Sequence, residues 1–228
     1  FVLDNSSYGN NGTMYGNTSG VGLNFTPNEG RFNGAFVFDG RDDYITIENR
    51  KPVNFTSEDF SIEFWFKANS LSRYLVSRYK GTDVGGYAVL FGGSSNAKPQ
   101  LFLEDGSLSN YYARTATNDY NDGIWHHFAG VATRVNGAYS GKIYIDGAED
   151  SGTLTTLGTV SFVNCSAPCN LTIGTISDLV STRFFNGTLD EVAIWNVSLS
   201  SQIIAKHSGY GIDKSIYGNN ATLMNLSV

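Results

Sequence analysis

The chain has 228 residues and a net charge of −6, and its 15 Lys and Arg form no cluster. It therefore offers no basic surface for a phosphate backbone, which excludes nucleic acid as an expected partner. No apolar run approaches the roughly 18 residues of a membrane-spanning helix, so we expect no membrane span. The length suits one large all-β domain.

Short apolar runs, interrupted by Gly, Asn, Asp and Ser, predict strands along most of the chain. Residues 34–48 predict two strands joined by the turn at 39–43. In residues 60–68 the side chains of successive residues point to alternate faces of a strand, with Ile62, Phe64 and Phe66 on one face. Further strands are expected at 73–79, 86–91, 100–105, 125–133, 141–150, 170–175 and 187–196. We expect the runs at 125–133 and 141–150 to pair, with the turn centred on Asp146 and Gly147.

A short amphipathic turn with helix-capping residues is predicted at residues 200–209. Ile203 and Ile204 give it an apolar side, Ser200 caps its start and Gly209 follows its end. Roughly ten or more short strands at turn-marked intervals favour two packed antiparallel sheets. The predicted fold is therefore an all-β, two-sheet jelly-roll sandwich.

The two ends of the chain carry the same phrase. "YGNNGT" at residues 8–13 returns as "YGNNAT" at residues 217–222, and Asp4 returns as Asp213 at the same offset. We therefore expect one domain at 1–208 and a tail at 209–228 that repeats the domain's start. The tail is either the start of a following module or an assembly strand that packs on this fold or on a neighbouring molecule.

Asn-x-Ser/Thr acceptor sites for N-glycosylation are in excess. Random placement of 22 Asn and 42 Ser or Thr in 228 positions would give about four sites, and there are 11. The excess indicates an exported, N-glycosylated protein whose acceptors lie on exposed loops or solvent faces; the alternative is an Asn- and Thr-rich chain with accidental sites. The acceptors are Asn5, Asn11, Asn17, Asn24, Asn54, Asn164, Asn170, Asn186, Asn196, Asn220 and Asn225.

The chain has two cysteines, Cys165 and Cys169, in the stretch "NCSAPCN". Three intervening residues, one of them Pro168, allow a small closed loop, so we expect a disulfide and an oxidising, extracellular location. The alternatives are two free thiols or half of a metal site. The metal reading lacks a nearby His or third Cys.

Seven stretches follow one another along the chain: "DNSSYGNNGT", "FDGRDDYITI", "FSIEFWFKA", "WHHFAGVAT", "KIYIDGAE", "NLTIGT" and "FNGTLDEVAIWNVSLSSQII". In this order they resemble the laminin-G-like, concanavalin A-like jelly-roll family, in the type repeated in surface proteins. The resemblance implies a convex and a concave sheet, a frequent calcium ion, and binding of glycans or proteins. Some relatives of this fold are glucanases with a Glu-x-Asp-x-x-Glu strand motif, which this sequence lacks.

Calcium takes six to eight oxygen ligands. The resemblance implies Asp190 as an anchor, with Asp4 and the carbonyl of Gly40 as companions. The alternative is that these residues only shape turns. Asp42 and Asp43 are a second acidic pair, which we expect to be turn residues rather than ligands.

Carbohydrate binding requires exposed aromatic rings beside polar groups. Tyr111, Tyr112 and Tyr120, in a long polar stretch, are the candidates for ligand binding. Tyrosines at strand ends are also commonly half-buried without a ligand.

Catalytic residues are not indicated. Glu63 shares a strand face with Trp65, which could stack on a sugar, but a glycosidase needs two carboxylates about 5 to 9 Å apart. His126 and His127 are adjacent on a strand and point to opposite faces, so they cannot hold one ion together. We therefore expect no enzyme.

We expect an extracellular, non-enzymatic surface module. The first hypothesis is assembly or adhesion, with neighbouring copies or tandem modules of the same protein as partners. The second is a calcium-dependent, lectin-like module that binds glycans. A glycoside hydrolase-like enzyme comes third.

Overall fold

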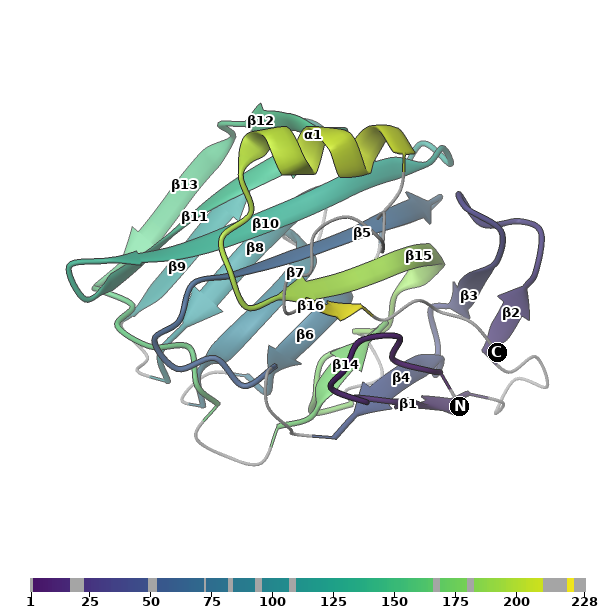
Figure 1. The fold of residues 1–228 in the computed structure, drawn as a ribbon, viewed down its shortest axis with the longest axis horizontal. Helices are drawn as coiled ribbons and strands as arrows, with labels where there is room; N and C mark the ends of the chain where they lie inside the picture. Colours follow the sequence, from purple (N-terminus) through teal and green to yellow (C-terminus); the bar gives the residue numbers. More distant parts are fainter. Residues whose placement is uncertain are drawn as a thin grey trace.

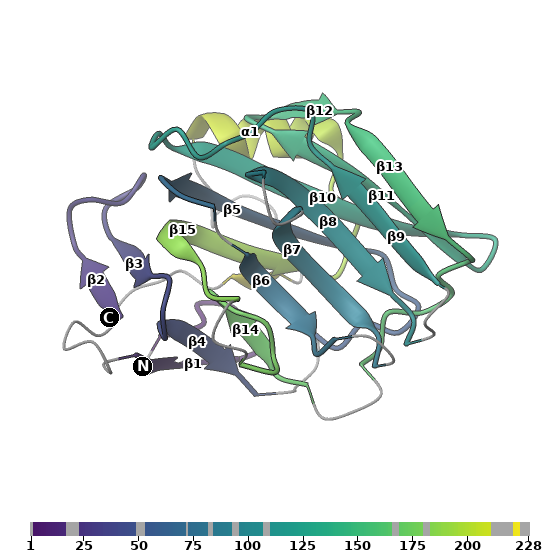
Figure 2. The ribbon, with the colours of Figure 1, turned by 180° about the vertical axis from the view of Figure 1, so that it is seen from behind.

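The computed structural model describes residues 2–16, 23–48, 53–71, 73–81, 84–92, 96–106, 110–165, 169–179, 183–210 and 221–223. Two antiparallel sheets pack face to face, and one helix covers the outer face of the second sheet (Figure 1). Figure 2 shows the molecule from the side of the first sheet. The expected all-β sandwich with two antiparallel sheets is confirmed.

The first sheet runs in the order β1 (Gly12–Tyr15), β4 (Tyr44–Ile47), β14 (Leu171–Ile173), β6 (Tyr74–Tyr79), β7 (Gly86–Gly92), β8 (Lys98–Glu104), β9 (Tyr111–Thr115) and β13 (Thr153–Leu157). The second runs in the order β12 (Ala148–Asp150), β11 (Ala138–Ile145), β10 (His126–Val135), β5 (Phe60–Ala68), β15 (Asn186–Trp195), β3 (Ala35–Asp39) and β2 (Asn24–Thr26). A further short strand, β16 (Ala221–Leu223), pairs with β15.

The core lies between the sheets and is rich in aromatic rings. The alternation predicted for β5 holds, because Ile62, Phe64 and Phe66 all belong to the main core cluster. Each fully buried ring of this size contributes about 1.5 to 3 kcal/mol to the free energy of unfolding. The Phe64 ring stacks on Phe128 of β10, at 5.3 Å between centroids, so neighbouring strands of one sheet share the same inner layer.

Residues 34–48 do form two strands, but those strands do not pair with each other. β3 pairs with β15 and β2 in the second sheet, whereas β4 pairs with β1 and β14 in the first. The turn at 39–43 thus carries the chain from one sheet to the other. Local alternation in the sequence cannot tell such a crossing from a hairpin, because both need buried alternate residues.

β10 and β11 pair as expected, but the predicted turn position is wrong. Their turn is at Asn136 and Gly137, with φ of 51° and 84°, whereas Asp146 and Gly147, with φ of 52° and 84°, join β11 to β12. Both are two-residue turns with positive φ at each position, which Asn-Gly and Asp-Gly favour. The sequence contained both signals.

The helix α1 (Ser201–Tyr210) lies across the outer face of the second sheet, at the top of Figure 1. Its start is capped as predicted: the Ile203 N–H reaches the Ser200 hydroxyl (3.4 Å) and the Ile204 N–H donates to the Ser200 carbonyl (3.0 Å). The predicted end is wrong, because Gly209 lies inside the helix and not after it. Ile204 is buried in a second apolar cluster, with Ala193 and Trp195 of β15. None of the described helices is long and apolar enough to cross a membrane.

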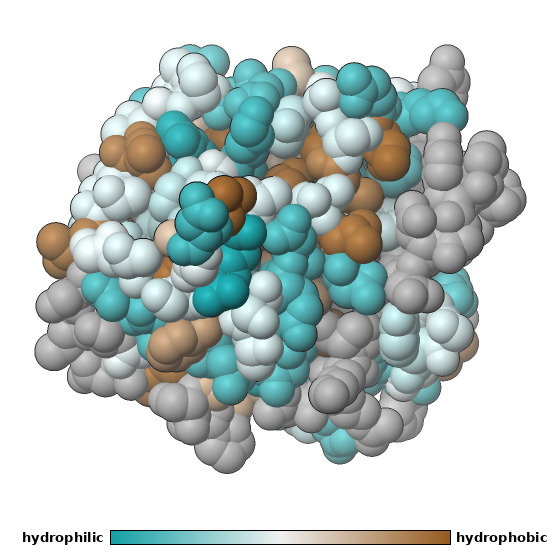
Figure 3. Space-filling model, turned by 60° about the vertical axis from the view of Figure 1, so that its left-hand side comes forward, coloured by the Kyte–Doolittle hydropathy of each residue, from teal (hydrophilic) through white to brown (hydrophobic). Residues whose placement is uncertain are grey.

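The side of the molecule that carries β9, β11 and β13 faces forward in Figure 3. Its brown, hydrophobic residues are interrupted by teal and white ones. Exposed apolar side chains here include Leu154 and Leu157 of β13, which lies at the edge of the first sheet. Scattered residues of this kind are normal on a soluble surface and do not indicate a docking site.

Candidate functional site

A hollow of about 390 Å³ lies between the start of the chain and the β1–β4 end of the first sheet. We call it the opening-loop hollow. It is lined by Gly9, Asn10, Asn11, Thr13, Tyr15, Thr46, Ile47, Glu48 and Asn170. Four of these nine residues belong to the phrase "YGNNGT" that recurs near the end of the chain.

Hydrogen bonds within the opening loop set the shape of the hollow. A β-bridge between Val2 and Gly12 closes the loop. Inside it, the Asp4 carboxylate accepts hydrogen bonds from the Ser6 N–H (2.9 Å), the Ser6 hydroxyl (2.7 Å) and the Asn10 N–H (2.7 Å). The Asn11 side-chain oxygen accepts one from the Asp4 N–H (3.0 Å). Asp4 therefore acts as an organiser of the loop.

The Asn10 side chain is buried against the hollow. Only 1% of its surface is exposed, and neither its amide oxygen nor its amide nitrogen has a hydrogen-bond partner among the described residues. Leaving a buried polar group unpaired costs about 1 to 3 kcal/mol. Both atoms are closed to solvent as placed, so a ligand that offers a hydrogen-bond donor and an acceptor would remove that cost once the side chain turned into the hollow.

An aromatic shelf adjoins the polar hollow. Tyr15 of β1 lies opposite Tyr44 of β4, and their rings stack with centroids 4.8 Å apart at 7° between planes. Tyr15 is 44% exposed. Tyr44 is more deeply placed: its burial, and secondly the charge of the Tyr15 hydroxyl, raise its pKa. A flat exposed ring beside amide and hydroxyl groups is typical of sites that bind amphipathic ligands such as sugars.

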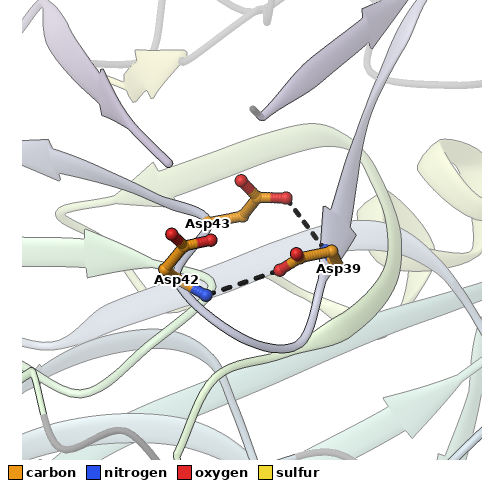
Figure 4. Close-up of side chains that lie close together, drawn as sticks. All are labelled: Asp39, Asp42 and Asp43. Atoms are coloured by element: carbon orange, nitrogen blue, oxygen red, sulfur yellow. Dashed lines mark hydrogen bonds between the residues drawn. The ribbon is translucent and has the colours of Figure 1, made fainter. Parts of the chain in front are cut away.

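Three carboxylates gather at the turn between β3 and β4, which we call the acidic turn (Figure 4). Ligand oxygens of Asp39, Asp42 and Asp43 all lie within 4.8 Å of one another. The Asp39 N–H donates to Asp43 Oδ2 (2.9 Å), and the Asp42 N–H donates to Asp39 Oδ1 (3.4 Å). Asp43 is only 1% exposed, and this burial raises the pKa of its carboxyl to about 6. The hydrogen bond from the Asp39 N–H lowers the pKa, and the charges of Asp39 and Asp42 raise it further.

The calcium ligands predicted from the sequence lie in different parts of the fold. Gly40 is in the acidic turn, with a φ of 79°, and Asp4 is in the opening loop. Asp190 lies in β15, where its carboxylate accepts from the Phe32 N–H (2.9 Å) and the Glu191 N–H (2.8 Å), and burial raises its pKa. Asn186, not Asp190, lies opposite Asp39. Asp190 lies four positions further along β15 than Asn186, or about 13 Å.

Calcium therefore stays a prediction, with a different set of residues favoured. The acidic turn is the group of His, Cys, Asp and Glu side chains within the described residues that could hold an ion. It includes Asp42 and Asp43, which the sequence suggested to be only turn residues. The turn is shaped by the Asp43 carboxylate and the Asp42 backbone N–H, but the side chains of both residues also converge with that of Asp39.

The three candidate tyrosines do not share one site. The Tyr112 hydroxyl donates to the Gly141 carbonyl (2.6 Å) between the sheets, and the ring is buried in the core. Tyr111 stacks on Phe102, with centroids 6.0 Å apart, and Tyr120 packs edge-on against the His126 ring at 4.8 Å. A sequence cannot tell inward from outward tyrosines in an irregular stretch. Ligand binding by any one of them remains a prediction.

A buried polar cluster that the sequence did not indicate lies beneath α1. Glu63 of β5 is fully buried, and its Oε1 accepts a hydrogen bond from the Trp195 indole N–H (2.7 Å) and lies 2.9 Å from His207 Nδ1. His127 Nε2 is 3.6 Å from the other carboxylate oxygen. A detectable signal did exist: His207 stands three residues after Ile204, on the same face of the helix.

The suggestion that Trp65 could stack on a sugar is wrong for this fold. Trp65 is only 4% exposed, because Arg31 and Phe32 cover its ring. The Arg31 guanidinium carbon lies 4.6 Å from the centre of the Trp65 ring, and the centroids of the Phe32 and Trp65 rings are 5.9 Å apart. The prediction for His126 and His127 holds. The His126 ring packs near Phe66 on the inner side, and the His127 ring near Trp65 on the outer side.

Residues 39–205 match the family model described as the concanavalin A-like lectin/glucanases superfamily. The chain belongs to this superfamily. The match covers most of the sequence and confirms the resemblance seen in the seven stretches. Comparison with curated protein sequences finds no match.

Solved structures of lectin-like proteins share the superfamily fold. The binding domain of botulinum neurotoxin DC in complex with rat synaptotagmin II matches with a TM-score of 0.63 and 14% identity over 92% of this chain and 49% of that one. The heptameric SAP-like pentraxin of Limulus polyphemus matches with a TM-score of 0.52 and 13% identity, over 83% of this chain and 90% of that one. A putative carbohydrate-binding protein of Bacteroides ovatus matches with a TM-score of 0.50 and 15% identity, over 84% of this chain and 50% of that one. The chain thus spans about half the length of the neurotoxin domain.

The superfamily includes both lectins and glucanases, and the hollow distinguishes them chemically. Glycoside hydrolysis uses two carboxylates about 5 to 9 Å apart on either side of the bond that is cleaved. Among the described residues that line the hollow, Glu48 is the one carboxylate. The described lining of the hollow therefore lacks the second carboxylate of such a pair.

Two further predictions concern the surface. Cys165 and Cys169 form a disulfide, as expected. Asn5, Asn11, Asn24, Asn170 and Asn186 are exposed, and Asn54, Asn164 and Asn196 are half-buried. Asn17, Asn220 and Asn225 lie outside the described residues. Attachment of glycans stays a prediction.

Proposed function

We propose that this protein is a non-enzymatic module of an exported surface glycoprotein, and that it acts in adhesion by binding carbohydrate in the opening-loop hollow. The buried, unpartnered amide of Asn10 carries the proposal. A side-chain amide can donate one hydrogen bond and accept another, and adjacent hydroxyls of a sugar ring can do the same.

The lining of the hollow favours uncharged sugars. Its polar groups are amides and hydroxyls, together with the Glu48 carboxylate, and no Lys or Arg is among the described lining residues. A carboxylate repels sialic acid or a sugar phosphate and accepts hydrogen bonds from neutral hydroxyls. The exposed Tyr15 ring would lie against the apolar face of the sugar.

Calcium at the acidic turn would support this site without contacting the sugar. Asp39, Asp42 and Asp43 supply carboxylate oxygens, and calcium prefers such ligands. Asp43 is followed directly by Tyr44, on which Tyr15 stacks. An ion that fixes the turn would therefore also fix the aromatic shelf.

Export is supported by the disulfide and by the excess of acceptor sites. Disulfides persist in oxidising compartments, and Cys165 and Cys169 form one. Five of the described acceptor asparagines are exposed, as glycan attachment requires. These observations support an extracellular location.

A second candidate function is assembly of copies of the chain into a string or filament. The observation that favours it is the pairing of β16, from the repeated terminal phrase, with β15. Adhesion and assembly are compatible, because the hollow and β15 belong to different sheets.

Binding of a panel of neutral and acidic oligosaccharides to the protein, measured by calorimetry, tests the first proposal. The panel should be applied to protein from a host that does not attach N-glycans. We expect Asn10→Asp and Tyr15→Ala each to weaken binding of a neutral sugar at least tenfold. Leu157→Ala is the control, because Leu157 is an exposed apolar residue on β13, at the other edge of the same sheet. Equal affinities in all four proteins, or no binding at all, would rule the hollow out.

A further inference from the structure

The repeated phrase begins a strand in both of its copies. In the first copy, β1 starts at Gly12, and in the second, β16 starts at Ala221, which is the same position at the offset of 209. The two strands have different partners. β1 pairs with β4 at the end of the first sheet, whereas β16 pairs with β15 in the second sheet.

One edge of β15 is shared by two short strands. β5 pairs with it from Gly187 to Trp195, but on the other edge β3 pairs only with Asn186–Leu189. A β-bulge then interrupts the register between Asp190 and Ala193, where Glu191 has a positive φ of 50°. Bulges bend a strand and end its pairing. Beyond the bulge, β16 takes the edge, with Ala193 opposite Leu223 and Trp195 opposite Ala221.

This edge is a place where a strand is needed. Ala193, Ile194 and Trp195 are all buried, beneath α1 or in the core. Their backbone groups on the edge away from β5 would lack partners without β16, and open edges of this kind recruit strands from other chains. Main-chain hydrogen bonds supply the affinity in such strand addition.

The second copy of the phrase is not suited to the position of the first. At Gly12, an added Cβ would come within 2.5 Å of the Ile45 side chain and 3.4 Å of Val2. The second copy has Ala221 there. A strand with alanine at this position cannot replace β1 beside β4 without displacing Ile45, so β15 is its better acceptor.

We propose that the β15 edge at Ala193–Trp195 is a strand-acceptor site whose partner is the Ala221–Leu223 strand of a second copy of this chain. This proposal rests on the second candidate function, assembly, and is independent of the hollow. Ten residues separate Tyr210, where α1 ends, from Ala221. Ten extended residues span up to about 33 Å. In the structure this strand pairs with β15 of its own chain. The proposed exchange replaces that contact with the same contact between two copies.

Three residue pairs make a weak contact by themselves. We therefore expect exchange to depend on protein concentration, and to gain strength only when each chain both donates and accepts a strand. Head-to-tail repetition of one contact gives open chains unless it closes into a ring. The expected product is a ladder of oligomers.

Engineered cysteines in register test the exchange on the full chain. Residues directly opposite in an antiparallel pair lie about 4.5 to 5.5 Å apart at Cβ, on one face, so Ala193→Cys and Leu223→Cys are placed to form a disulfide. After brief oxidation, a mixture of the two single variants should give a mixed dimer on non-reducing gels. The double variant should give a ladder that grows with concentration. Ala193→Cys mixed with Thr222→Cys is the out-of-register control and should link much less.

A disulfide that forms only within one chain at every concentration would overturn the proposal, and so would the absence of any disulfide. A second measurement does not depend on cysteines. Thr222→Pro removes a backbone N–H from β16, whereas Thr222→Val keeps strand propensity, and both remove the acceptor site at Asn220 equally. By light scattering, we expect oligomers for Thr222→Val and monomers for Thr222→Pro. Equal masses would count against exchange, whereas sugar binding by either variant reports separately on the hollow.

Discussion

Glu63 and His207 are 144 residues apart in the sequence and lie 2.9 Å apart in the structure, measured from the carboxylate Oε1 to the imidazole Nδ1. Both side chains are buried, and the Trp195 indole N–H donates to the same carboxylate oxygen. Through this contact, strands β5 and β15 and helix α1 share one polar cluster. The helix is therefore fixed to the sheet by a specific pair as well as by its apolar face.

Removing Glu63 should loosen this attachment. Loss of one partner from a buried pair leaves the other without compensation, which typically costs 3 to 5 kcal/mol. We expect Glu63→Ala to lower the free energy of unfolding by about 3 kcal/mol, as measured by urea denaturation. Glu149→Ala, which breaks the exposed Lys142–Glu149 pair (2.9 Å), is the control and should leave the transition midpoint unchanged. Similar midpoints for both variants would show that the cluster does not hold the helix.

The same cluster makes stability depend on pH through His127. Burial, opposed by the charge of Glu63, lowers the pKa of His127 below its usual 6.5. Below pH 6.5 the unfolded chain therefore binds a proton that the folded chain resists, so this contribution to stability falls as the pH drops from 6.5 towards the folded pKa. His126 acts in the opposite sense, because the Asp146 hydrogen bond raises its pKa.

We expect the difference in unfolding free energy between the wild type and His127→Gln to change between pH 7 and pH 5, to the disadvantage of the wild type. Urea denaturation at a series of pH values measures it. His126→Gln is the matched control and should shift the difference in the other direction. A constant difference for His127→Gln would show that this ring takes up its proton equally in both states.

Calcium binding at the acidic turn should be linked to protons. Asp43 has a folded pKa of about 6, above its usual 3.8, so without an ion its contribution to stability is lost as the pH rises from about 3.8 to 6. A cation binds the ionised form. We therefore expect calcium affinity to rise about tenfold between pH 5 and pH 7, as calorimetry would measure.

Asp43→Asn should abolish that dependence and most of the affinity. Glu29→Gln, at an exposed carboxylate away from the acidic turn, should change neither. If chelators leave the melting temperature of the wild type unchanged and calorimetry detects no binding, the acidic turn is a structural turn alone.

The sequence determines much of this fold locally. Alternation in β5 placed Ile62 and Phe64 in the core, and Asp-Gly at 146–147 identified a turn, because both features depend only on neighbouring residues. The sheet to which β4 belongs depends on β1 and β14, which pair with it from opposite ends of the sequence. No local pattern contains that information.

The candidate site was harder to predict, for the same reason. Asp4 and Gly40 were plausible calcium ligands by type, but the hydrogen bonds of Asp4 and the position of Asp190 along β15 follow from packing. The sequence places Asn10 in the repeated phrase, as an oxygen-bearing residue of the opening loop. Its importance rests on burial without a partner, which is a property of the folded chain.

The hollow also contains two acceptor sites for N-glycans, at Asn11 and Asn170. A glycan attached at either position would lie at the mouth of the hollow and compete with a free sugar.

Asn170→Gln keeps a side-chain amide but cannot be glycosylated. We expect this change to raise the affinity for a neutral oligosaccharide several-fold in protein from a glycosylating host, and to leave it unchanged in protein from a host that attaches no glycans. Asn186→Gln, at an exposed acceptor outside the hollow, is the control. Equal effects of the two changes in the glycosylated protein would mean that attached glycans do not reach the hollow.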